Sequence, residues 1–86
     1  MILLITNKKS YSELSNEILS LNIPIWFGSK ILHQEELEDL RNNGLNVTNF
    51  NYKIDDHSEI NLDRALQTIK EHHPGDIIHV NKLSAN

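Results

Sequence analysis

The fold class of this 86-residue chain is decided by one stretch, Ile23-Pro24-Ile25-Trp26-Phe27-Gly28-Ser29-Lys30. It contains an apolar run that ends at Gly28, and it lacks the alternation of apolar and polar residues that marks a strand with one wet face. A short continuous run of this kind is typical of a strand buried on both faces. We therefore expect a sheet covered by helices, with a turn at Gly28.

On the N-terminal side of this stretch, the sequence predicts another strand and a helix. Residues 1–6 are apolar without alternation, which indicates a second buried strand. Ser10 and Glu13 have the spacing of a capping box, which predicts a helix that begins near Tyr11 and ends at Asn22.

On the C-terminal side, a helix is expected to follow Lys30 and to continue to Asn43, because Gly44 suits a left-handed C-cap. Residues 45–52 then have the composition of a third strand. The apolar residues of this strand change phase partway, which indicates either a bulge or a change in which face is covered. Leu45 and Val47 form one set, and Phe50 and Tyr52 form the other.

A third helix and a fourth strand complete the pattern. The helix must end before Pro74-Gly75, which has the composition of the centre of a type II turn. Residues 76–81 are mostly apolar and predict the last strand, and residues 82–86 are expected to be a frayed tail. The buried stripe of the third helix is Leu62, Ala65, Leu66 and Ile69.

The alternation of strands and helices predicts an α/β fold with the element order βαβαβαβ. Parallel neighbours need crossover connections, so we expect a mainly parallel four-stranded sheet with three helices covering its faces, in flavodoxin/Rossmann-like layering. Residues 1–81 would form this single domain. Right-handed crossovers leave the strand orders 2-1-3-4 and 2-1-4-3, and both place the first strand beside the second.

Composition excludes several classes of function. The chain has 8 Lys and Arg against 12 Asp and Glu, a formal charge of −4, which disfavours binding to nucleic acid. With no cysteine, it cannot form a disulfide, a thiolate metal site or a cysteine nucleophile. No stretch is long and apolar enough to span a membrane, so we expect a cytoplasmic protein without membrane contact.

The strongest candidate site is an anion site at the carboxyl ends of the first two strands, where ligands bind in open parallel sheets. Two neighbouring loops there would each lead into a helix N-terminus, which favours negative charge. Neither loop matches a known phosphate-binding motif, and the two serines could equally be helix caps. The candidate anion-binding residues are Asn7, Lys8, Lys9, Ser10, Gly28, Ser29 and Lys30.

A weaker candidate pocket contains Asp55, Asp56 and His57 in the loop before the third helix. These residue types suit a divalent cation or a general base, but they match no known loop spacing. Acidic residues before a helix also arise from complementarity to its dipole. We therefore expect no metal, no cofactor and no catalytic residue, and an enzyme is the less favoured interpretation.

The functional hypothesis is a small non-enzymatic interaction or regulatory module that binds a protein partner or a second copy of itself. A small core and an edge strand of uncertain phase motivate it. The candidate interface residues are Trp26, Phe50 and Tyr52, although Trp26 suits the core at least as well. The alternative is a binder of a small phosphorylated or nucleotide-like ligand at the anion site.

Overall fold

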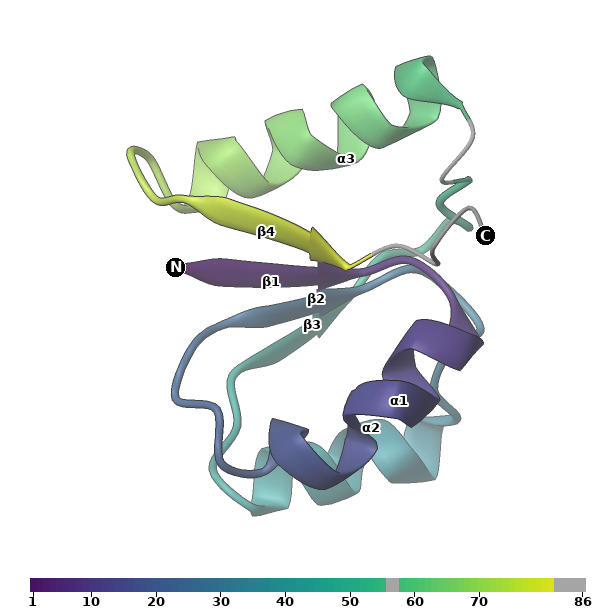
Figure 1. Ribbon diagram of the computed structural model, residues 1–86, viewed down its shortest axis with the longest axis vertical. Helices are drawn as coiled ribbons and strands as arrows, with labels where there is room; N and C mark the ends of the chain where they lie inside the picture. Colours follow the sequence, from purple (N-terminus) through teal and green to yellow (C-terminus); the bar gives the residue numbers. More distant parts are fainter. Residues whose placement is uncertain (56–57, 82–86) are drawn as a thin grey trace.

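The computed structural model describes residues 1–55 and 58–81, and within these ranges the chain forms four strands and three helices in alternation (Figure 1). The sheet is parallel throughout, and helices cover both of its faces, which confirms the predicted α/β fold. The predicted tail at 82–86 lies outside the described residues. The elements are β1 (Ile2–Ile5), α1 (Lys8–Ile18), β2 (Ile25–Phe27), α2 (Gln34–Asn42), β3 (Val47–Asn49), α3 (Glu59–His72) and β4 (Ile78–Asn81).

The strand order is β3-β2-β1-β4, so both predicted orders are wrong, although β1 does lie beside β2. The reason lies in where the helices pack. α1 and α2 lie on the same face of the sheet, and α3 lies on the other (Figure 1). Two successive right-handed crossovers on one face extend the sheet in one direction, and a crossover on the opposite face returns the chain. That return places β4 beyond β1, at an edge of the sheet.

Each face of the sheet has its own hydrophobic core. On the face of α1 and α2, Leu3, Ile5 and Phe27 pack against residues from both helices. On the face of α3, Trp26 packs with Ala65 and Ile69 of that helix. The alternation of Trp26 and Phe27 between the two cores shows that β2 is buried on both sides, as its unbroken apolar run predicts.

The phase change predicted within residues 45–52 is present, but the third strand is shorter than predicted, because β3 covers only Val47–Asn49 and the chain then crosses to the other face of the sheet. Leu45 and Val47 pack into the core beneath α1 and α2, whereas Phe50 and Tyr52 pack into the core beneath α3. Ile54 follows them into the α3 core and is 2% exposed. The connection is therefore anchored on the α3 face before that helix begins.

The helix starts differ from the prediction, because other residues serve as caps. α1 begins at Lys8, and Asn7 is its N-cap, with Oδ1 accepting from the Ser10 N–H at 2.8 Å. Ser10 is therefore a buried residue of the first turn and not a cap. α2 begins only at Gln34, and His33 at its N-cap donates its N–H to Glu36 Oε1 at 3.1 Å.

The two predicted glycine stops are confirmed. Gly44 follows α2 with a φ of 86°, and Gly75 lies in the turn before β4 with a φ of 81°. Both values are in the left-handed region, which glycine adopts without the steric cost that a Cβ imposes. The N–H of Asp76 donates to the carbonyl of His73 at 3.3 Å, which closes the turn around Pro74-Gly75.

Candidate functional site

Three loops meet at the carboxyl ends of β1, β2 and β3, as the sequence predicts. Gly28 donates its N–H to the carbonyl of Ile5 at 3.0 Å, which sets the loop after β2 beside the loop after β1. Ser29 donates its N–H to the carbonyl of Tyr52 at 3.1 Å, which joins the segment after β3 to the same cluster. The structure therefore places Gly28 beside the end of β1, which leads into α1, and Ser29 beside the segment that follows β3.

The start of α1 has an unusual charge distribution. Its first turn contains Lys8 and Lys9, which are both exposed, and no acidic residue. An anion near a helix N-terminus stabilises the helix by about 0.3–1 kcal/mol, and a cation there is unfavourable for the same reason. Ser10 is fully buried in the same turn, and its Oγ has no hydrogen-bond partner among the described residues. This turn has basic charge and a spare hydroxyl group in one place.

The loop after β2, which supplies Gly28, Ser29 and Lys30 to the predicted anion site, does not present a second helix N-terminus beside that of α1. Ser29 and Lys30 do not lead directly into a helix, because α2 begins only at Gln34. Glu35 and Glu36 already occupy the first turn of α2. Negative charge therefore stands at the helix N-terminus that was expected to attract an anion.

Tyr11 shows how close this negative charge lies to α1. Burial raises the pKa of its hydroxyl group, and the Glu36 carboxylate adds to the effect by repelling the phenolate. Its ring packs edge-on against Phe27, with the ring centroids 5.6 Å apart. The positive potential of Lys8 and Lys9 is thus opposed by an acid from the neighbouring helix.

The candidate interface residues lie largely inside the molecule. Trp26 and Phe50 are each 5% exposed, and their ring centroids are 5.1 Å apart beneath α3. Tyr52 is half-buried, and the Arg64 guanidinium carbon lies 4.8 Å from its ring centroid, as in a cation–π pair. Trp26 and Phe50 therefore belong to the core beneath α3, and Tyr52 lies at the margin of that core.

The acidic pocket can be placed only in part, because Asp56 and His57 lie outside the described residues. Asp55 is exposed, and its N–H donates to Oδ1 of Asn61 in the first turn of α3. Ser58 is the N-cap of that helix, with Oγ accepting from the Asn61 N–H at 3.3 Å. In residues 1–55 and 58–81, no three His, Asp or Glu side chains group as metal ligands would.

A further surface, which the sequence did not indicate, is the outer edge of β4. The N–H of Ile2 in β1 donates to the carbonyl of Ile77 at 2.8 Å. Because backbone groups alternate in direction along a strand, the N–H and carbonyl of Ile78 and of Val80 face away from β1. No hydrogen bond from the described part of the chain reaches these outward groups.

The opposite edge of the sheet is covered differently. At β3, Arg41 of α2 donates from Nη2 to the carbonyl of Val47 at 3.1 Å. Arg41 is in the last turn of α2, so the helix itself holds the guanidinium over the edge. Charged side chains over an edge strand are a common way to prevent pairing with another chain.

A groove of about 230 Å³ runs beside the β4 edge, on the face of the sheet that α1 covers. Leu3 of β1 and His79 of β4 contribute to its lining from the sheet, and Leu14 contributes from α1. Two strongly exposed apolar residues lie at the start of these strands, Met1 at 63% and Ile77 at 72%. His79, a polar residue within the otherwise apolar strand β4, is exposed at this surface.

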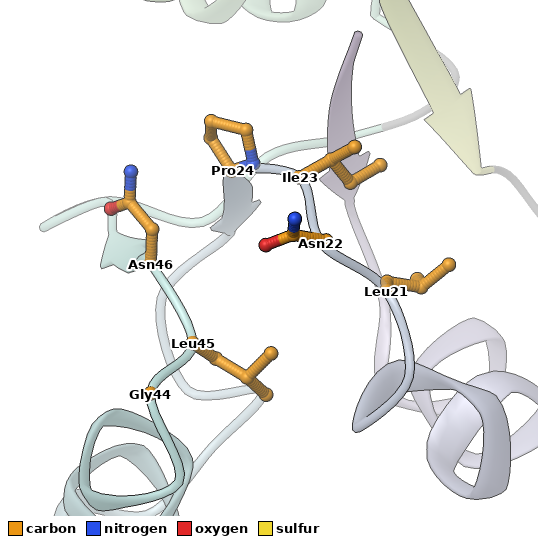
Figure 2. A pocket seen from close by; sticks show the side chains of 7 residues that line it. All are labelled: Leu21, Asn22, Ile23, Pro24, Gly44, Leu45 and Asn46. Carbon is orange, nitrogen blue, oxygen red and sulfur yellow. The ribbon is translucent and has the colours of Figure 1, made fainter.

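A smaller pocket of about 180 Å³ lies between the loops that enter β2 and β3 (Figure 2). Asn22 and Pro24 line it from one loop, and Leu45 and Asn46 line it from the other. It is at the amino ends of the strands, opposite the edge where ligands bind in parallel α/β sheets. Its two amides form no charged or nucleophilic cluster, so we assign no chemistry to it.

None of the helices described in residues 1–55 and 58–81 is long and apolar enough to cross a lipid bilayer. Comparison of the chain with protein-family models, with curated proteins and with solved structures finds no match.

Proposed function

We propose that the chain is a small interaction module that docks an extended segment of a partner on the outer edge of β4. The observation that carries this proposal is the contrast between the two edges of the sheet. The Arg41 guanidinium donates to the outer carbonyl of Val47 in β3, whereas no hydrogen bond from residues 1–55 and 58–81 reaches the outward N–H and carbonyl groups of Ile78 and Val80 in β4. An open strand edge is a template for pairing with another chain.

The groove beside β4 supports this proposal. When a strand is added to a sheet edge, the backbone hydrogen bonds supply affinity, and alternate side chains enter pockets that supply specificity. The groove lies on the face of β4 that presents His79, next to the exposed apolar side chain of Met1. Alternate apolar side chains of a docked strand would cover this surface.

A selection of random nine-residue peptides on the immobilised protein tests the proposal for partner segments of any sequence. Enriched peptides are expected to slow amide hydrogen exchange at Ile78 and Val80, because these N–H groups become ladder donors. Val80→Pro removes one outward donor and leaves the donors that face β1 unchanged. This variant should raise the peptide dissociation constant at least tenfold, because the loss of one hydrogen bond costs about 1.4 kcal/mol.

The matched control is Asn49→Pro, which makes the same change on the outer edge of β3. Peptide affinity should stay within a factor of two in this variant, because the proposed docking edge is β4, on the opposite side of the sheet from β3. Circular dichroism establishes that both variants fold. Peptides that protect amides elsewhere, or a selection that enriches none, would contradict the proposal.

A second candidate function, binding of a small phosphorylated ligand at the start of α1, is favoured by one specific observation. Lys8 and Lys9 share the first turn of that helix with Ser10, whose buried Oγ has no hydrogen-bond partner among residues 1–55 and 58–81. Free N–H groups, two ammonium groups and a spare hydroxyl group are the donors that a phosphate accepts. The adjacent Gly28 N–H is already used by Ile5, so this site would depend on the α1 turn.

Thermal denaturation with inorganic phosphate and with adenosine monophosphate tests this second candidate. A ligand at 100 times its dissociation constant stabilises the protein by about 2.7 kcal/mol, which raises the melting temperature by several degrees. Changing both Lys8 and Lys9 to Ala should abolish the increase, and Lys70→Ala at the end of α3 should leave it intact. If neither compound stabilises the wild type, the candidate is excluded.

A further inference from the structure

We infer that Asn43-Gly44 is a self-modification site, at which the chain forms a succinimide and then isoaspartate, and that the C-cap of α2 controls the rate of this reaction. It is the only Asn-Gly pair in the sequence. Glycine favours the reaction because no Cβ obstructs the approach of its nitrogen to the preceding side chain. Both residues are exposed, and a Cβ built on Gly44 would meet no atom within 4 Å, so water also has access.

The reaction needs only water and hydroxide from the solvent. Hydroxide removes the proton of the Gly44 N–H, and the nitrogen then attacks Cγ of Asn43. The side-chain nitrogen takes a proton from water and leaves as ammonia, and nothing is oxidised or reduced. Water opens the ring at either carbonyl. Cleavage of the bond to Cγ gives aspartate, whereas cleavage of the bond to the backbone carbonyl carbon gives isoaspartate, whose main chain runs through Cβ and Cγ.

The closed C-cap holds the two reacting groups apart. Asn43 donates from Nδ2 to the carbonyl of Asp39 at 2.8 Å, and the Gly44 N–H donates to the carbonyl of Arg41 at 3.0 Å. Asn43 has a ψ of 9°, which places the Gly44 nitrogen beside the Asn43 nitrogen and away from Cβ. Ring closure needs the Gly44 nitrogen and Cβ on the same side of the Cα–C bond. The cap must therefore open before Asn43 reacts.

Several contacts hold this cap closed. It has the hydrogen bonds of a Schellman motif, because the Leu45 N–H donates to the carbonyl of Leu40 at 3.1 Å beyond the left-handed Gly44. Figure 2 shows Gly44 directly after the last turn of the helix. The Leu40 and Leu45 side chains belong to the same core. Arg41, in the same turn, also donates to the carbonyl of Val47 in β3, so the sheet helps to fix the end of the helix.

Isoaspartate at this position would keep the cap open. The extra backbone carbon displaces the Gly44 and Leu45 N–H groups from the carbonyls of Arg41 and Leu40. The new carboxylate also stands at the negative end of the helix dipole, where an anion is unfavourable. Arg41 then loses its fixed position beside Val47. Modification would therefore expose the outer edge of β3, which the guanidinium protects in the intact chain.

Peptide mapping by mass spectrometry, after the full chain is aged at neutral pH and body temperature, tests the site itself. Asn43 should lose ammonia and gain water, and an isoaspartyl methyltransferase should label the product. Asn46 is the internal control, because it is also exposed but precedes Val47, whose branched side chain obstructs the attack. Conversion of Asn43 no faster than that of Asn46 would overturn the inference.

The rate measured in guanidinium chloride provides the reference without a cap. In buffer, the reaction should be slower by about the factor that protects the Gly44 amide from hydrogen exchange, since both need the same opening. Arg41→Ala should raise this rate about two- to tenfold, because it removes one hydrogen bond to β3 and retains the backbone carbonyl that Gly44 uses. Lys70→Ala, in the last turn of α3, is the control and should leave the rate unchanged. Equal rates in buffer and denaturant, or an unchanged rate in Arg41→Ala that circular dichroism shows to be folded, would overturn control by the cap.

Hydrogen exchange of the aged protein, separated by ion exchange, tests the effect of the product. The Leu45 amide should exchange faster than in the fresh protein, and the urea midpoint should fall. Asn43→Asp adds the charge without the extra carbon, so its changes should be smaller. Asn43→Gln should age without either change, because attack on its longer side chain closes a larger ring more slowly. Unchanged exchange at Leu45 in the isoaspartate form would show that the cap tolerates the modification and would overturn the proposed release of Arg41.

Discussion

Trp26→Ala is expected to lower the free energy of unfolding by about 3–5 kcal/mol, the range found when a large buried aromatic residue is truncated. Trp26 is 5% exposed, and it packs against Phe50 and, through ring edges, against His72 at the end of α3. No neighbouring side chain can fill the space of an indole without moving the helix. A domain of this size has a total stability of about 4–13 kcal/mol, so much of the protein would unfold.

Urea denaturation followed by far-ultraviolet circular dichroism measures this loss, because the variant lacks the tryptophan fluorescence signal. Ile60→Ala is the matched control, since Ile60 in the first turn of α3 is 85% exposed and its truncation should cost less than about 0.5 kcal/mol. Trp26→Phe should retain most of the stability. A loss below about 1 kcal/mol for Trp26→Ala would show that α3 does not cover this side chain in solution.

Phe27→Ala is expected to cost a similar amount, about 3–5 kcal/mol, although the residue belongs to the other core. Its side chain is fully buried beneath α1 and α2, and it makes an edge-to-face contact with Tyr11. Truncation would remove that contact and leave a cavity between β2 and the two helices. Neighbouring residues of β2 thus stabilise opposite faces of one sheet.

Urea denaturation of Phe27→Ala can be followed by the fluorescence of Trp26, which lies on the opposite face. If the domain unfolds in one cooperative step, fluorescence and circular dichroism should give the same midpoint. Leu19→Ala, at an exposed position just after α1, is the control and should change the midpoint little. Divergent midpoints would show that the two cores unfold separately, which contradicts a shared sheet as their common support.

The spacing of apolar residues was sufficient to predict the order of strands and helices, because it reflects which sides of each strand or helix are buried. The apolar run of β2 predicted a doubly buried strand, and Trp26 and Phe27 do enter different cores. The phase change between Val47 and Phe50 was likewise predictable from the spacing of apolar residues alone. Helix starts were less predictable, because Asn7 and Ser10 are both good caps and only the fold shows which one is used.

The candidate sites were predictable only in part. The loops at Gly28 and at the start of α1 are neighbours, as two adjacent parallel strands require. The sequence could not show whether the two loops form one anion site, because this depends on where α2 begins. The helix begins at Gln34, which places Glu35 and Glu36 in its first turn. The β4 edge was not predicted as a surface, because the two predicted strand orders disagreed on whether the fourth strand lies at an edge or inside the sheet.

The sequence by itself determined that this chain builds a mainly parallel sheet covered by helices, because the spacing of apolar residues indicates which sides of each strand and helix are buried. The tertiary structure alone decided that β4 lies beyond β1 and that α3 crosses the opposite face. Ladder hydrogen bonds between parallel strands differ little with sequence, so they do not specify which strands pair. The choice depends on packing summed over a whole face, and it places β4 at an edge of the sheet with the backbone groups of Ile78 and Val80 facing away from β1.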